Sequence, residues 1–175
     1  MSISELKLIR LEQNTEIKSF NSTDVDLNDF LFSDAKNYYS QLMAVTYLLE
    51  DKDKTVAYYS LLNDKITFEE NQKGVRNRIN RNIPFSKHMN YYPAMKIGRL
   101  VVSEEYSGKN IGSEILTFLK YLFTNNNRTG CRFIIVDAYN NERAIKFYQR
   151  NRFDFLTMED EDKDTRLMYY DLMKN

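Results

Sequence analysis

A cluster of small residues stands directly before a long amphipathic stretch at "YSGKNIGSEILTFLKYLF", residues 106–123. The apolar residues recur at helical spacing, so a helix is expected to begin near Ile111. A helix N-terminus carries unpaired amide groups and a partial positive charge, and a loop that turns its amides inward completes an anion cradle. Because an anion approaches a backbone closely only where side chains are small, the stretch predicts an anion site, with pyrophosphate as a natural occupant. The residues that could form it are Ser107, Gly108, Lys109, Asn110, Ile111, Gly112 and Ser113.

Two familiar phosphate-binding loops do not fit this stretch. The Walker motif requires Gly where Ser103 stands and Ser or Thr where Asn110 stands. The Rossmann fingerprint requires three glycines opening the first strand–helix unit, which Gly108 and Gly112 do not supply. On spacing alone, a plain turn in which Gly108 only relieves backbone strain remains an equal alternative.

Composition limits the classes of function that are open to the chain. At 175 residues one domain is expected, and 25 basic residues balance 25 acidic ones, so overall charge favours neither nucleic acid nor an anionic membrane. The single cysteine, Cys131, and the single histidine, His88, exclude an intramolecular disulfide, a cysteine-based zinc cluster and a multi-histidine metal site. No metal, no membrane segment and a cytoplasmic location are therefore expected.

The pattern of elements predicts an α/β domain. Its mixed central sheet should have about six to seven strands and be flanked by helices. A helical region should start at Thr23, which has Asp26 three residues on as a capping box, and Leu122 should lie on the apolar face of the helix that begins at Ile111. The expected strands are 7–11, 44–50, 55–62, 95–103, 132–139, 153–158 and 165–173; a short helix covers 141–151, and 63–92 forms a polar, basic insertion.

The stretch at 107–112 resembles the pyrophosphate-binding loop of the GNAT family of N-acetyltransferases, whose pattern is Q/R-x-x-G-x-G/A between a strand and a helix. Gly112 matches the second glycine. Ser107 replaces Gln or Arg, and Asn110 replaces the first glycine; Asn tolerates left-handed backbone better than other non-glycine residues. The resemblance implies a GNAT fold over residues 1–175 and acetyl-CoA as cosubstrate.

A second segment, "NERAIKFYQRNRF" at 141–153, resembles the family's N-x-x-A-x-x-x-Y-x-x-x-G-F pattern, with Arg152 in place of glycine. The resemblance implies that Asn141 and Ala144 lie at the cofactor and that Tyr148 points towards its sulfur. The strand residues Leu100, Val101 and Val102 would line the cofactor through their backbone.

The chain also resembles the subgroup of these acetyltransferases that act as toxins on aminoacyl-tRNA, although the subgroup's Cys-Gly pair is absent. The positions that match it are Phe20, Leu27, Phe30, Leu31, Gly98, Arg99, Leu100 and Val101.

These observations predict an acetyl-CoA-dependent transfer of an acetyl group to a primary amine, which is a small molecule, a protein amine or the amino acid on charged tRNA. Tyr148 is the candidate general acid for the departing thiolate, and a backbone amide near Leu100 or Val101 is the candidate oxyanion donor. Glu104, Glu105 and His88 are weaker candidates for a base. The alternative is a non-catalytic module that kept the fold and lost the chemistry.

Partners are suggested by a run of cations within residues 73–87, which could contact a tRNA backbone or could simply be a solvated insertion. The cations are Lys73, Arg76, Arg78, Arg81 and Lys87. The acidic turn "EDEDKD" at 159–164 is interpreted as a solvated hairpin tip. Folds of this kind often pair through exposed sheet edges, so a homodimer is one option for the assembly.

Overall fold

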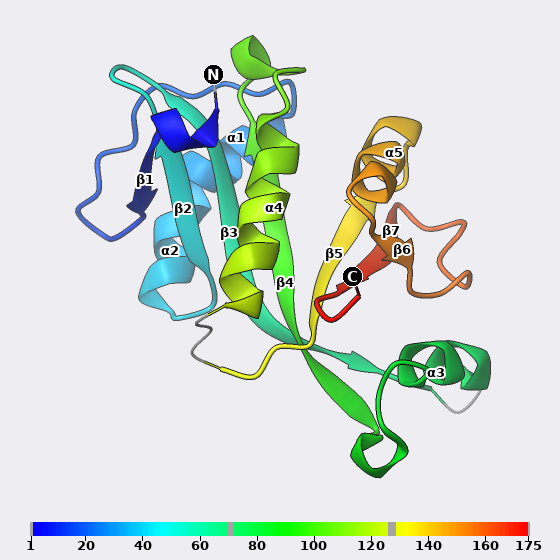
Figure 1. Ribbon diagram of the computed structural model, residues 1–175. Coiled ribbons are helices and arrows are strands. Elements are labelled where there is room, and N and C mark those ends of the chain that lie inside the picture. Colours follow the sequence, from blue (N-terminus) through cyan, green and yellow to red (C-terminus); the bar gives the residue numbers. More distant parts are fainter. Residues whose placement is uncertain (1, 70–71, 126–128, 175) are drawn as a thin grey trace. The chain divides into compact units, whose positions relative to one another are not determined.

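A computed structural model describes residues 2–69, 72–125 and 129–174 (Figure 1). Within them the strands form one seven-stranded sheet in the order β1-β2-β3-β4-β5-β7-β6. The α/β class and the mixed, helix-flanked sheet expected from the sequence are confirmed. The chain divides into two compact units, the first comprising Met1–Leu62 and Ile97–Tyr121 and the second Asn63–Lys96 and Leu122–Asn175.

The strands of the first unit follow the predicted hairpin closely. β1 (Lys7–Arg10) pairs antiparallel with β2 (Val45–Glu50), and β2 pairs antiparallel with β3 (Thr55–Thr67). β3 continues beyond the predicted end at 62, and β4 (Tyr91–Val102) begins before the predicted start at 95. Both ends of the expected insertion at 63–92 are therefore strand, and its residues 70–71 lie outside the described residues.

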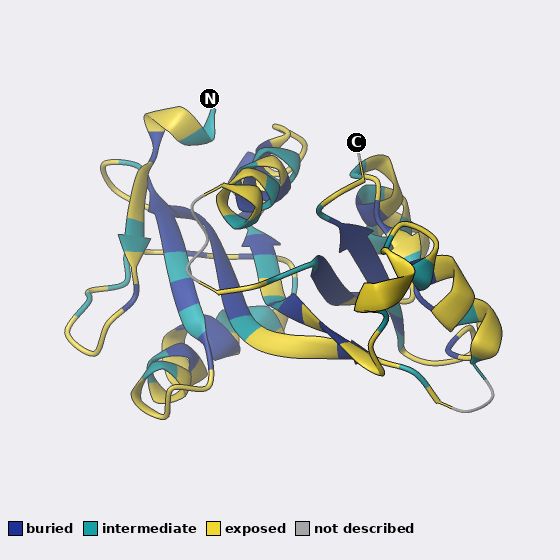
Figure 2. Cartoon of the chain, turned by 60° about the horizontal axis from the view of Figure 1, so that its bottom comes forward, coloured by how far each residue is buried: buried dark blue, intermediate teal, exposed yellow. Residues whose placement is uncertain are grey.

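Two sets of helices cover opposite faces of these strands (Figures 1 and 2). α1 (Val25–Asp29), a π-helical turn (Phe30–Asp34) and α2 (Ala35–Ser40) cover one face, and α4 (Ile111–Thr124) covers the other. The predicted cap at Thr23 is wrong. The backbone of Asp24 is extended, and its Oδ1 accepts the Leu27 amide at 3.3 Å, so the helix starts one residue later.

Tyr58 lies at the centre of the core beneath α1 and α2. It is fully buried, its hydroxyl donates to the Leu27 carbonyl at 2.6 Å, and its ring contacts Phe20 and Phe30. The bond removes the cost of burying a phenol hydroxyl, so the aromatic ring can fill the core.

The buried apolar face of α4 is shorter than predicted. Ile111, Ile115, Leu116 and Leu119 are buried, but Leu122 is 39% exposed. The prediction for Leu122 is wrong because burial stops one turn before the end of the helix.

The second unit places a helix on each face of its strands. β5 (Phe133–Tyr139) pairs antiparallel with β7 (Thr165–Asp171), which also pairs with the short β6 (Asp154–Phe155). Tyr169 packs with Ile79 of α3 (Lys73–Asn80). Its neighbour Tyr170 contacts Phe153, which contacts Tyr148 of α5 (Glu142–Arg150). Because successive strand residues point to opposite faces, α3 and α5 lie on opposite sides of β7.

Four described residues have a left-handed backbone that favours glycine: Leu42 (φ 56°), Gly108 (φ 78°), Asn110 (φ 64°) and Arg152 (φ 67°). Asn110 and Arg152 stand where the family pattern has glycine. The pattern therefore marks a backbone requirement that this chain meets without glycine.

We expect Arg152→Gly to be more stable than Arg152→Ala by about 1 kcal/mol, because only alanine keeps the cost of a Cβ in left-handed backbone. Both variants lose the arginine side chain, so their difference isolates the backbone term. Urea denaturation of the two proteins measures it, and equal midpoints would contradict the assignment of strain.

Candidate active site

The residues predicted to bind an anion lie in the connection from β4 to α4. A 3-10 turn, Glu104–Tyr106, follows β4, then come the left-handed Gly108 and Asn110, and α4 starts at Ile111. The Glu114 amide donates to the Asn110 carbonyl at 3.1 Å, so the amides of Ile111 and Gly112 precede this first helical bond. A Cβ at Gly108 would meet nothing within 4 Å, which leaves open space beside the backbone. These features fit a pyrophosphate bound by backbone amides.

Two of the predicted loop amides are already used. The Ser107 amide donates to the Glu104 carbonyl at 3.0 Å, and the Lys109 amide donates to the Tyr106 carbonyl at 3.3 Å. The Lys109 ammonium lies 4.6 Å from the centre of the Tyr106 ring. Ser113 lies in the first turn of α4, and its carbonyl accepts from Thr117 Oγ1 at 3.0 Å. The amides of Gly108, Asn110, Ile111 and Gly112 thus remain the better candidates for binding an anion.

The three predicted cofactor residues of β4 point to two different faces of the strand. Val101 is buried in the cluster with Phe30 and Tyr58, so only its backbone could serve a ligand. Leu100 and Val102 are half-buried and point the other way, as alternation along a strand requires.

In the second unit, α5 carries the other predicted residues. Asn141 is the N-cap, and its Oδ1 accepts the amide of the half-buried Ala144 at 2.9 Å. The oxygen of Asn141 therefore starts the helix, which leaves its Nδ2 as the group suited to a ligand.

Tyr148 is buried on α5, with its ring edge-on to Phe147 and Phe153. Burial raises the pKa of its phenol above the ordinary value. Among the residues that the structure describes, none hydrogen-bonds to its hydroxyl. The group therefore stays protonated at neutral pH, and its accessible hydroxyl keeps the proton available to a ligand.

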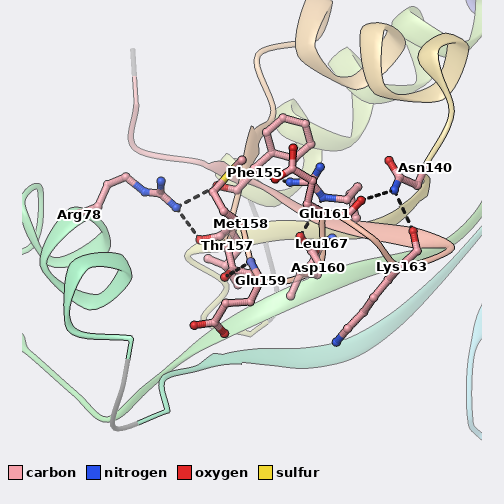
Figure 3. Close-up of polar contacts among 12 residues, drawn as sticks. Arg78, Asn140, Phe155, Thr157, Met158, Glu159, Asp160, Glu161, Lys163 and Leu167 are labelled. Carbon is pink, nitrogen blue, oxygen red and sulfur yellow. Dashed lines mark hydrogen bonds and ion pairs between the residues drawn. The ribbon is translucent and has the colours of Figure 1, made fainter.

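The five cations of the basic segment at 73–87 differ in their contacts, which the sequence does not indicate. Arg78 Nη2 donates to the carbonyls of Phe155 and Leu156 at 2.8 and 2.5 Å (Figure 3), and its guanidinium lies 5.7 Å from the Tyr169 ring. Arg78 is thus a structural contact to the closing hairpin.

Of the other four cations, Arg76 donates to Asn90 Oδ1 at 3.1 Å. Lys73, Arg81 and Lys87 are exposed, and no described residue pairs with their charges. Phe85, between the last two, is 87% exposed.

The acidic turn at 159–164 is only partly solvated. Asp160 is buried, pairs with Arg166 at 2.8 Å and accepts the Leu167 amide at 2.6 Å (Figure 3). Asn140 Nδ2 donates to the carbonyls of Glu161 and Lys163 at 2.8 Å each. The interpretation as a plain solvated tip is wrong for Asp160, whose burial has no signal in a run of acidic residues.

Two of the three candidate bases are engaged by other groups. Glu105 pairs with Lys54 at 2.6 Å, and His88 Nε2 lies 2.9 Å from the Ile83 carbonyl. Glu104 and Glu105 border a surface pocket of about 420 Å³ in the first unit, which sequence patterns did not indicate. Its other lining residues are Ser19, Phe20, Asn21, Lys54 and Ser103.

Within residues 2–69, 72–125 and 129–174, no three His, Cys, Asp or Glu side chains gather as a metal site. The same part of the chain has no helix of the length and apolarity needed to cross a bilayer.

Comparison with solved structures finds toxin acetyltransferases. AtaT complexed with acetyl-methionyl-tRNAfMet superposes with a TM-score of 0.75 at 18% identity, covering 95% of this chain and 94% of that chain. AtaTR bound with acetyl-CoA gives 0.74 at 17% identity over 97% and 95%. A tyrosine-to-phenylalanine mutant of KacT gives 0.73 at 20% identity over 96% and 95%. At these identities the likeness establishes the fold.

No curated protein sequence matches the chain. Residues 44–154, more than half of the chain, match the family described as the acetyltransferase (GNAT) domain. This match includes β4, the loop before α4, and α5 with Asn141 and Tyr148. The chain therefore belongs to the GNAT acetyltransferase family.

Proposed function

We propose that this protein is an acetyl-CoA-dependent N-acetyltransferase that acts on a primary amine. The observation that carries the proposal is Tyr148, whose side chain is buried while its hydroxyl remains accessible, has no partner among the described residues and keeps its proton at neutral pH. An accessible hydroxyl on an otherwise buried ring can donate to a bound ligand. Membership of the family and the acetyl-CoA complexes among its structural neighbours support the choice of cosubstrate.

Acetyl-CoA would be bound by two kinds of group. In the first unit, the amides of Gly108, Asn110, Ile111 and Gly112 would hold the pyrophosphate, because they combine open backbone with a helix N-terminus. The backbone of Leu100 to Val102 would pair with the pantetheine amides. Asn141 is proposed as a cofactor contact through Nδ2 on the family pattern alone.

In the reaction, the neutral acceptor nitrogen would attack the thioester carbon, the carbon–sulfur bond would break, the nitrogen would release one proton to water, and the sulfur would take a proton. Tyr148 would donate this proton from its hydroxyl, and water would restore it afterwards. A backbone amide near Leu100 or Val101 would stabilise the oxyanion. An α-amine has a pKa close to neutrality, so no dedicated base is required for such an acceptor.

The competing proposal is a cofactor-binding module without catalysis, suggested by Ser107, Asn110 and Arg152 at positions where the family pattern differs. Two of these three departures leave the backbone conformation as the family pattern requires it. Asn110 and Arg152 adopt the left-handed conformation that glycine would supply. The catalytic proposal is therefore favoured.

For the acceptor, we propose the amino acid on charged tRNA. The neighbour AtaT has been captured with acetyl-methionyl-tRNAfMet. In this chain, Lys73, Arg81 and Lys87 present unpaired charge among the described residues, and the exposed ring of Phe85 lies between them in sequence. Cations bind phosphates, and an exposed aromatic ring can stack on an unpaired base.

Tyr148→Phe should lower turnover by about 10²-fold or more, in the range of a lost general acid, while the Kd for acetyl-CoA changes little. The variant removes only one oxygen from a buried ring, so folding should persist. Thiol release with an amine acceptor measures kcat, and calorimetric titration measures the Kd.

Tyr121→Phe is the matched control, since Tyr121 is 66% exposed on α4 and lies outside the proposed machinery. Its turnover should equal that of the wild type. Full turnover by Tyr148→Phe would remove Tyr148 from the mechanism.

Replacing Lys73, Arg81 and Lys87 together by glutamine should weaken retention of aminoacyl-tRNA on filters and flatten its dependence on salt, because fewer phosphate contacts release fewer counterions. Activity on a small amine should be unchanged. The matched control replaces the exposed Lys7, Arg10 and Lys52, which removes the same charge from the first unit. Equal losses in the two triple variants would show a general charge effect and refute the assignment.

A further inference from the structure

We propose that Tyr106 and Asp51 are positioning residues that hold the connection before α4 in its anion-binding conformation. The inference rests on the proposed function, since it concerns the same loop, but it assigns roles to residues that no motif marks. The Tyr106 hydroxyl donates to Asp51 Oδ2 at 2.6 Å, and Tyr106 is only 8% exposed. This bond ties the loop that follows β4 to the turn between β2 and β3.

The Asp51 end of this bond is fixed. Asp51 Oδ1 accepts the amides of Asp53 and Lys54 at 2.9 and 2.8 Å, so one carboxylate oxygen closes the turn and the other receives the phenol. The Asp51 carbonyl accepts from Lys18 Nζ at 2.9 Å, and that ammonium also pairs with the buried Glu50 at 3.0 Å.

The pKa shifts of Tyr106 and Asp51 agree with a phenol that donates to a carboxylate. The bond to Asp51 raises the pKa of Tyr106 to about 12, and the bond from Tyr106 lowers the pKa of Asp51 below its ordinary value. At neutral pH the pair is therefore a phenol donating to a carboxylate, which is a strong, charge-assisted bond.

The Tyr106 end leads directly into the cradle. The Tyr106 carbonyl accepts the Lys109 amide at 3.3 Å, and the Lys109 ammonium lies over the Tyr106 ring. These contacts bracket the left-handed Gly108, and Asn110 follows immediately. A second link, Lys54 to Glu105 at 2.6 Å, is exposed and is expected to contribute little.

The consequence is a cradle that is organised before the ligand arrives. Without the bond, binding would have to order the loop, and that cost would appear as weaker affinity for ligands that use the loop. The chemical step, which does not involve Tyr106, would keep its rate.

Tyr106→Phe tests this, because phenylalanine keeps the ring under Lys109 and removes only the hydroxyl. We expect the Kd for acetyl-CoA to rise about tenfold, the scale of one hydrogen bond to a charged group. The Kd for acetyl-pantetheine, which lacks the pyrophosphate and the nucleotide, should not change. Hydrogen exchange of the amides at 107–112 should be faster in the unliganded variant than in the wild type.

Asp51→Asn leaves one side-chain oxygen for the amides of Asp53 and Lys54, so its Nδ2 faces the Tyr106 hydroxyl and can only donate to it. A neutral bond of reversed direction then replaces the charge-assisted one, and we expect a smaller rise in the Kd than for Tyr106→Phe. Asp53→Asn removes a charge from the same turn without touching the bond, and it should match the wild type.

If Tyr106→Phe binds acetyl-CoA as the wild type does, the positioning role is refuted while the proposed function stands. Equal weakening for both ligands, with a lower melting temperature, would indicate a general structural role and would also refute it. Failure of the wild type itself to bind acetyl-CoA would refute the proposed function and this inference together.

Discussion

The site depends on how the backbone passes from β4 into α4. The connection has to turn the chain while leaving amides unpaired, and two left-handed residues, Gly108 and Asn110, accomplish this. At the proposed anion site, stabilisation would come from main-chain dipoles and a helix N-terminus rather than from a charged side chain. A site of this kind would not require Gln or Arg where Ser107 stands, because the backbone supplies the donors.

A backbone site of this kind needs external support. In the first unit, α4 is anchored by Ile111, Ile115 and Leu119, which are buried in the core, and the loop is anchored through Tyr106 to the turn at Asp51. In the second unit, Asn141 fixes the start of α5 and therefore the position of Tyr148 two turns later. Local capping and core packing thus place the groups to which the chemistry is assigned.

Much of the fold was predictable because its signals are local. β-branched and aromatic runs marked β2, β3 and β5, and helical periodicity marked α4 and α5. The predictions failed where long-range contacts decide. Nothing near Arg78 in the sequence shows that it binds the carbonyls of Phe155 and Leu156, and nothing in the acidic run shows that Asp160 is buried against Arg166.

In the candidate site, too, local features were predictable and long-range contacts were not. The small residues before α4 and the Asn141–Tyr148 spacing are visible in the sequence, whereas the Tyr106–Asp51 bond joins residues that are far apart in it. That contact has no local pattern. The pairing of β2 with β3 forms the turn at Asp51, and β4, which lies beside β3, leads to Tyr106.

The most direct test of the account is a balance of products. The protein is incubated with acetyl-CoA carrying an isotope-labelled acetyl group and with aminoacyl-tRNA, and free thiol and labelled amide are both counted. The account predicts equal amounts of the two, with the label on the α-amine of the amino acid. Tight binding of acetyl-CoA with neither product, across tRNA and a panel of small amines, would contradict catalysis and leave a cofactor-binding module.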